Sequence, residues 1–185
     1  MTLLPPKNSW YFEKNEINAV AKMLDSSASV TYKKCWIWKL GSLKNSATVL
    51  GSTLYIPLNW NSNQAYNVLP HEILGHVKQF KKYTWPGMIF LYGFFFLPIF
   101  FAWGRYRLEL DANIEQWRYM LKNYTGGYAK NEVFLTDWIL SNAQKTADRI
   151  SSSFYLFAMP RYYTRSGFKK AALKLISEFI ALDKE

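Results

Sequence analysis

The chain has little cysteine, little histidine and a shortage of negative charge. A single cysteine, Cys35, among 185 residues excludes an internal disulfide framework, so the composition gives no sign of an oxidising compartment. Cys35 falls in a stretch that reads as a strand, which favours a structural role. The opening residues, MTLLPPKNSW, lack a charged stretch followed by an apolar run, so we predict no signal peptide.

Acidic residues are too few to balance the basic ones. The chain has 23 Lys and Arg against 13 Asp and Glu, a formal net charge of +10. Such a surplus favours an anionic partner or a membrane surface, although a solvated basic surface is the simpler interpretation. No specific nucleic-acid motif organises the basic residues. They are spread along the chain: Lys33, Lys34, Lys78, Lys81, Lys82, Arg105, Arg107, Arg161, Arg165, Lys169 and Lys170.

Hydrophobic residues, in contrast, make up 50% of the chain, which predicts an ordered single domain over residues 1–185. Periodic apolar positions predict helices over 9–25, 70–82, 105–123, 131–150 and 166–182. Strands are expected over 30–40 and 48–58, the second interrupted at Gly51-Ser52 by a bulge or a tight hairpin. The order indicates an α+β fold, with a small antiparallel sheet before a mainly helical half.

An uncharged segment runs from Tyr83 through Gly104. Its length is near that of a membrane span, and aromatic and basic residues flank it. Three residues inside it, Pro86, Gly93 and Pro98, argue against one straight helix. We therefore weigh a true span against a segment that folds back on itself as a hairpin-like insertion.

Both histidines of the chain lie in one short stretch, LPHEILGHVKQF. In the H-E-x-x-H motif of zinc enzymes, histidines four apart share a helix face. Here His71 and His76 are five apart, which on a regular α-helix splays them by about 140°. A shared metal ion therefore requires a π-type turn around Leu74-Gly75, or an irregular helix start from Pro70 to His71.

The stretch resembles two groups of zincin metallopeptidases. HEILGH matches the H-E-x-x-G-H variant found in the dipeptidyl-peptidase III family. The continuation VKQF resembles small bacterial and phage-encoded zincin-like proteins with H-E-x-x-H-x-x-Q. In that second group a strand like TVLGSTLYI precedes the helix, and an aromatic segment and a helix beginning like YRLELDA follow it. The resemblance covers roughly residues 47–116.

This resemblance implies a zinc site and a general base. The implied zinc ligands are His71, His76 and Glu109. Glu72 would serve as the general base toward a metal-activated water. Spacing alone also allows Asp111 or Glu115 as the third ligand, and Asn113, one turn from Glu109, could orient a ligand.

A shared metal also constrains the uncharged segment. Metal-binding atoms of His76 and Glu109 would lie within about 4 Å, whereas a straight span would separate them by roughly 30 Å. Under the zinc hypothesis the segment must therefore fold back near Gly93 or Pro98. It would then be a buried hairpin, a membrane-dipping hairpin, or a patch covered by a partner.

The leading hypothesis is thus a zinc-dependent metallopeptidase that hydrolyses peptide bonds in a peptide or protein substrate. The 48–58 strand would pair with extended substrate. Candidate oxyanion-stabilising residues are Tyr155, Arg161, Tyr162 and Tyr163. The alternative is a structural or interaction protein of a larger assembly, such as a phage virion, that keeps a zincin fold with a structural or lost zinc site. A membrane-attached protein anchored by 83–104 is a third possibility. A cytoplasmic or virion-associated location is expected rather than secretion.

Overall fold

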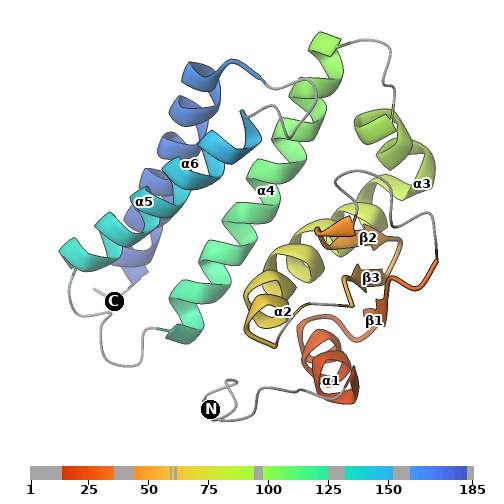
Figure 1. Cartoon of the computed structure of the whole chain (residues 1–185). Coiled ribbons are helices and arrows are strands. Elements are labelled where there is room, and N and C mark those ends of the chain that lie inside the picture. The colour runs from red at the N-terminus through yellow and green to blue at the C-terminus, as the bar shows by residue number, and fades with distance from the viewer. Residues whose placement is uncertain are drawn as a thin grey trace. The chain divides into compact units, whose positions relative to one another are not determined.

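The computed structural model describes residues 14–35, 44–58, 60, 62–93, 98–124, 132–151 and 159–182. In chain order the elements are α1 (Lys14–Leu24), β1 (Ser29–Tyr32), β2 (Thr48–Leu50), β3 (Thr53–Ile56), α2 (Ser62–Leu69), η3 (Pro70–Val77), α3 (Lys78–Gly93), α4 (Pro98–Tyr124), α5 (Glu132–Ile150) and α6 (Arg161–Leu182) (Figure 1). The α+β class is confirmed. The chain forms two compact units, Met1–Met88 and Ile89–Glu185, and each is described by itself. The single domain over 1–185 stays a prediction.

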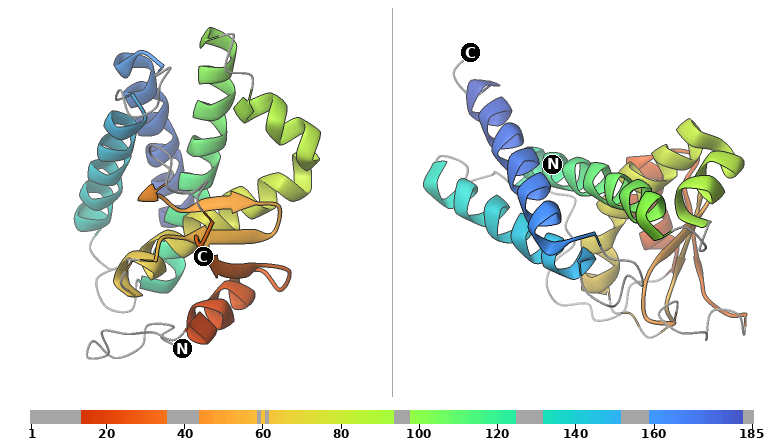
Figure 2. Two further views of the ribbon diagram at one scale, coloured as in Figure 1. Left: turned by 45° about the vertical axis from the view of Figure 1, so that its right-hand side comes forward. Right: turned by 90° about the horizontal axis from the view of Figure 1, so that it is seen from above.

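The sheet of the first unit is mixed, so the expectation of an antiparallel sheet was wrong. Strand β3 lies between the other two, parallel to β1 and antiparallel to β2 (Figure 2). The β2–β3 connection is the tight hairpin expected at Gly51-Ser52, where Gly51 has a φ of 64°. Glycine tolerates this left-handed backbone because it has no Cβ. Strand β1 is shorter than predicted: Cys35 lies beyond it and is exposed, and residues 36–40 are outside the described part.

Helix α1 supplies one side of the first core. Ile17 and Ala21 are buried, and Val20 and Leu24 pack beside them, so these four residues form an apolar stripe on one face of the helix. These side chains join buried residues of all three strands and of η3: Val30, Val49, Leu54, Ile56, Ile73 and Val77. Because both β2 and β3 contact η3, the sheet forms the support against which the histidine-bearing helix is held.

The histidine-bearing helix starts earlier than the sequence suggested. Residues from Ser62 are already helical, so Pro70 lies inside a continuous helix rather than in its first turn. Proline has no N–H to donate to the carbonyl four residues before it. The helix changes from α to π geometry at Pro70, where this missing donor means that no α-type hydrogen bond is lost.

Helix α3 is broken at Thr84. This residue has φ 59° and ψ 176°, outside the helical region, and is the one described non-glycine residue with a positive φ. A β-branched residue in this conformation costs about 1–3 kcal/mol. The break lies close to Lys82, the expected end of the motif helix.

Within the second unit, the uncharged segment reverses direction between Leu91 and Gly104. A Cβ placed on Gly104 would lie 3.3 Å from the carbonyl oxygen of Leu91. Thirteen residues of straight helix would separate these positions by about 20 Å, so the chain must reverse between them. The expected turn near Gly93 or Pro98 coincides with the end of α3 and the start of α4. Residues 94–97 lie outside the described part. Among the described residues, no helix is long and apolar enough to cross a membrane.

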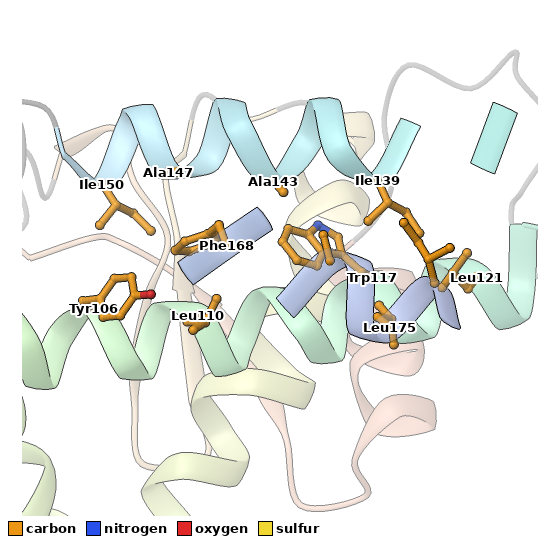
Figure 3. Close-up of a cluster of buried hydrophobic side chains, with 12 residues drawn as sticks. Tyr106, Leu110, Trp117, Leu121, Ile139, Ala143, Ala147, Ile150, Phe168 and Leu175 are labelled. Atoms are coloured by element: carbon orange, nitrogen blue, oxygen red, sulfur yellow. The ribbon is translucent and has the colours of Figure 1, made fainter. Parts of the chain in front are cut away.

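The rest of the second unit is built from α4, α5 and α6. Figure 3 shows Phe168 of α6 between Tyr106 and Leu110 of α4 and Ala147 of α5. On α6, Phe168, Ala172, Leu175 and Ile176 are buried and Phe179 packs against them, as periodic apolar positions on one helix face would place them. The predicted start of α6 was wrong.

Helix α6 begins five residues before the expected start at residue 166. It starts at Arg161, directly after Pro160, so Ser166 lies inside the helix. The backbone N–H groups of Tyr163 and Thr164 donate to the Pro160 carbonyl and close the first turn. Ion pairs from Arg161 and Arg165 to Asp148 of α5 hold that turn in place. A contact between helices therefore moved the start, which a local capping signal does not report.

Candidate metal centre

A π-helical turn carries both histidines. Residues Pro70–Val77 form the π segment, which includes the expected position Leu74-Gly75. In a π-helix the hydrogen bonds run between residues five apart, so residues five apart return to the same face. The rings of His71 and His76 meet edge to face, with centroids 4.9 Å apart. The additional residue in the motif is thus accommodated by the backbone.

The turn also brings a carboxylate to the two imidazoles. One ligand atom from each of His71, Glu72 and His76 lies within 4.8 Å of the others. Two nitrogens bound to one tetrahedral zinc ion lie about 3.3 Å apart, given Zn–N bonds of about 2.0–2.1 Å. Both histidines are buried and Glu72 is half-buried, so the group can hold a metal ion.

Gln79 fixes the orientation of His76. The side-chain oxygen Oε1 of Gln79 lies 2.9 Å from Nδ1 of His76, and both residues are buried. An amide oxygen only accepts hydrogen bonds, so Nδ1 carries the proton in this contact, and a metal ion would bind His76 through Nε2. Gln79 follows His76 by three residues, which places it on the same side of the helix. The glutamine of VKQF therefore acts on the candidate ligand.

Lys33 is the residue that sequence reasoning missed. It was grouped with the dispersed surface cations, but it is only 7% exposed, whereas its neighbour Lys34 is exposed. Its Nζ donates to the Ser46 carbonyl at 2.6 Å and to Oγ1 of Thr48 at 2.7 Å. Thr48 begins β2, a strand that contacts η3. The Lys33 side chain thus reaches from the end of β1 to β2, the edge strand that contacts the histidine-bearing helix η3.

Burial lowers the pKa of Lys33 to about 8, and the negative charge of Glu72 acts in the opposite direction. The site therefore has a partly desolvated positive charge near the proposed general base. Two consecutive lysines after an apolar strand are an ambiguous signal, because either one can point inward. Only the packing distinguishes them.

Candidates for the third ligand lie in the second unit, on α4. Glu109 is buried at 6% exposure, Asp111 is exposed, and Glu115 pairs with Arg118. A buried carboxylate requires a hydrogen-bonding, charged or metal partner. Burial thus favours Glu109 among the three. Its convergence with the histidines of the first unit stays a prediction.

Asn113 stabilises the backbone around Glu109. Its side-chain amide donates to the Glu109 main-chain carbonyl at 2.7 Å, and Asn113 itself is 2% exposed. The expected proximity of the two residues is confirmed. The observed hydrogen bond goes to the main-chain carbonyl of Glu109, one helical turn before Asn113, and not to the Glu109 carboxylate.

The candidate oxyanion-stabilising residues all come from late in the chain. Arg161 pairs with Asp148, and hydrogen bonds from Arg165 and Arg161 hold the pKa of Asp148 well below its usual range. Tyr162 is 85% exposed, Tyr163 is 48% exposed and contacts Tyr106, and Tyr155 lies outside the described residues. These placements give no support for a catalytic role of any of them.

Comparison with known protein families, with curated proteins and with solved structures gave no match. The assignment of this site therefore depends on the chemistry and geometry of its own residues.

Proposed function

We propose that the chain is a zincin-like, zinc-dependent metallopeptidase. The observation that carries this proposal is the π turn, which brings His71, Glu72 and His76 within 4.8 Å despite a spacing that an α-helix could not use. Such π turns are uncommon and occur frequently at functional sites. A helix with a decayed site has no need to keep this distortion.

The residues fit a zinc ion in number and type. Two neutral imidazoles and one carboxylate are common protein ligands of a catalytic zinc, and the carboxylate that the family resemblance implies is Glu109. The Gln79 hydrogen bond supports this fit, because metal-binding histidines usually donate their second ring N–H to an oxygen. A zinc ion in such a site polarises a carbonyl group and lowers the pKa of water.

The chain's own groups would perform the remaining steps. Glu72 takes a proton from the attacking water and then delivers it to the leaving amine. Strand β2 is an edge of the described sheet and contacts η3, whereas β3 is paired on both sides. An extended peptide added at β2 would be held by backbone hydrogen bonds, which accept varied sequences. The proposed substrate is accordingly a peptide or an unfolded protein segment.

Metal analysis and one substitution test the proposal. Purified protein should contain zinc at one ion per chain, and it should cleave a mixed peptide library. Glu72→Gln should abolish cleavage and keep the zinc, because the amide cannot accept the proton. Glu16→Gln, an exposed change on α1, is the matched control and should retain activity. Absence of zinc, or full cleavage by the Glu72→Gln variant, would refute the mechanism.

A structural zinc site is the second candidate. The burial of His71 and His76, at 7% and 6% exposure, favours it, because structural zinc sites are closed to solvent. In that case zinc would be present without cleavage, and its removal by a chelator would lower the melting temperature. The protein would then serve as an interaction component of a larger assembly.

A further inference from the structure

Helix α6 (Arg161–Leu182) has a buried side and an exposed, strongly basic side. The buried side includes Phe168 and Leu175, which belong to the core of the second unit (Figure 3). The exposed side, which we name the basic face of α6, carries Tyr162, Arg165, Lys169, Lys170 and Lys174. We infer that this face binds single-stranded nucleic acid. The inference is independent of the metal centre, because all the residues of the basic face belong to the second unit.

Charge is the first argument. Helix α6 contains five basic residues and one acidic residue, so it contributes +4 to the formal net charge of +10. In the linear sequence these cations are dispersed, but the helix brings four of them to its exposed side. Arg165 and Lys169 are one turn apart, and so are Lys170 and Lys174, which gives two short rows of positive charge. Such a surface complements a polyanion with closely spaced charges, and nucleic acid has one phosphate per nucleotide.

The lysines of the basic face are not neutralised by strong ion pairs. Among the residues that the structure describes, neither Lys169 nor Lys170 pairs with a carboxylate. Lys174 lies 3.8 Å from Glu178, but both side chains are exposed, and an ion pair of this kind contributes little to stability. All three ammonium groups can therefore bind phosphate without breaking a contact that holds the fold together.

Asp148 of α5 orients two arginines without cancelling both of their charges. Arg165 donates to this carboxylate through Nε at 2.6 Å and through a terminal nitrogen at 2.8 Å, and Arg161 donates through Nε at 2.9 Å. One negative charge therefore faces two guanidinium groups, and both arginines remain exposed. A guanidinium has five N–H donors, so each arginine can bind phosphate through the donors that Asp148 does not use.

Tyr162 indicates which form of nucleic acid fits this face. Its side chain is 85% exposed, and Arg165 and Lys169 follow it by three and seven residues, on the same side of the helix. The bases of a single strand stack on exposed aromatic rings beside a positively charged track, whatever their sequence. In a duplex the bases are already stacked on one another, so an exposed tyrosine among cations favours a single strand.

Other anionic partners fit the basic face less well. A helix that lies on a lipid bilayer inserts an apolar face, but the apolar face of α6 is buried against α4 and α5. The distance from Tyr162 to Lys174 along the helix is about 18 Å, at about 1.5 Å per residue. A strand with about 3.4 Å per nucleotide would place about five phosphates along this length. An acidic protein surface rarely has carboxylates so closely and regularly spaced.

Fluorescence anisotropy tests the inference with the full chain and a labelled oligothymidylate longer than the basic face. We expect binding at about 0.1 M salt, where the Debye length is about 10 Å, and weaker binding as salt is raised. If four cations contact phosphates, the slope of log K against log salt concentration should be about −3, since each contact on a single strand contributes about −0.7. The duplex of this oligonucleotide with its complement should bind more weakly, because its bases cannot stack on Tyr162.

Substitutions on the basic face locate the contact. Lys169→Gln combined with Lys170→Gln should make the salt slope less steep by about 1.4, because two phosphate contacts are lost. Tyr162→Ala should weaken binding about five- to 150-fold, the range expected for losing one stacked base. Tyr162→Phe keeps the ring and should bind like wild type. All three side chains are exposed, so circular dichroism should show an unchanged fold.

The matched control for charge lies in the first unit. Lys22→Gln combined with Lys34→Gln also removes two exposed positive charges and should leave the salt slope unchanged. An equal change of slope in this control, or no binding to the oligonucleotide at about 0.1 M salt, would overturn the inference. Equal or tighter binding to the duplex would also overturn it. So would displacement of the oligonucleotide by polyglutamate or by phosphatidylglycerol vesicles at the same concentration of negative charge, because the partner would then be an acidic protein or a membrane.

Discussion

Gln79 offers the sharpest test of the candidate metal centre, because it contacts His76, a proposed ligand, and is not itself proposed to bind the metal. Its Oε1 accepts the Nδ1 proton of buried His76 at 2.9 Å. Gln79→Leu keeps most of the volume and removes the acceptor. The Nδ1–H group then has no acceptor at this position, at a cost of about 1–3 kcal/mol. The variant should therefore unfold at a lower temperature even in the metal-free form.

The effect on zinc is separable from this loss of stability. Without the acceptor, His76 is no longer held in the tautomer and orientation that present Nε2. Losing such a partner costs about 10–100-fold in metal affinity, or about 1.4–2.7 kcal/mol. The measurement is a competition titration of the metal-free protein against a chelating dye at constant pH.

Two further variants make the test decisive. Gln79→Glu keeps an acceptor and should retain wild-type zinc affinity or improve it, since carboxylates are common partners of metal-binding histidines. Gln144→Leu, an exposed change on α5, controls for losing any glutamine. If Gln79→Leu bound zinc as tightly as wild type, the assignment of Nε2 of His76 as a zinc ligand would be wrong.

Three other predictions concern buried or paired groups. Burial lowers the pKa of Lys33 to about 8, so above that pH the unfolded chain binds more protons than the folded chain. The free energy of unfolding should therefore rise between about pH 8 and 10. Lys33→Met should flatten this rise, as measured by urea titration at each pH. Gly167→Ala should destabilise rather than stabilise the helix, since its Cβ would collide with the Tyr106 hydroxyl, and Tyr106→Phe should restore much of the loss in thermal melts. A hydrogen bond from Lys81 lowers the pKa of Asp25 to about 2. The stabilisation from this pair is therefore present above about pH 4 and is lost as the pH falls toward 2. Asp25→Asn should lower the free energy of unfolding by about 0.2–1 kcal/mol at pH 7 and leave it unchanged near pH 2.

Sequence determined those features that depend on short stretches of chain. If His71 and His76 share a metal ion, their five-residue spacing requires a π-type turn or an irregular helix start, because a regular α-helix would point them apart. Gly51-Ser52 gave the hairpin for a similar reason: a tight reversal needs a residue that accepts positive φ. The apolar stripe of α1 and the core face of α6 were also readable, since helix periodicity places their side chains on one side.

Tertiary structure decided what depends on partners distant in sequence. Strand direction is one case, because β1 pairs with β3 in parallel across an intervening hairpin, and no local pattern records that choice. Pro70 is compatible with a helix start or with a change of helical register, and only the preceding helix α2 showed which applies. The start of α6 followed from ion pairs to Asp148 rather than from Ser166.

Some residues of the candidate site are placed by local helix geometry, and others by packing between distant segments. Local helix geometry brings His71, Glu72, His76 and Gln79 together, so the sequence alone could locate them. Burial of Lys33, and of Glu109 in preference to Asp111 or Glu115, depends on which faces the surrounding elements cover. Chain geometry over one or two turns is fixed by bond lengths and sterics, whereas burial is fixed by packing between segments. For that reason the sequence determined the candidate metal-binding turn, and only the tertiary structure decided which charged residues are buried.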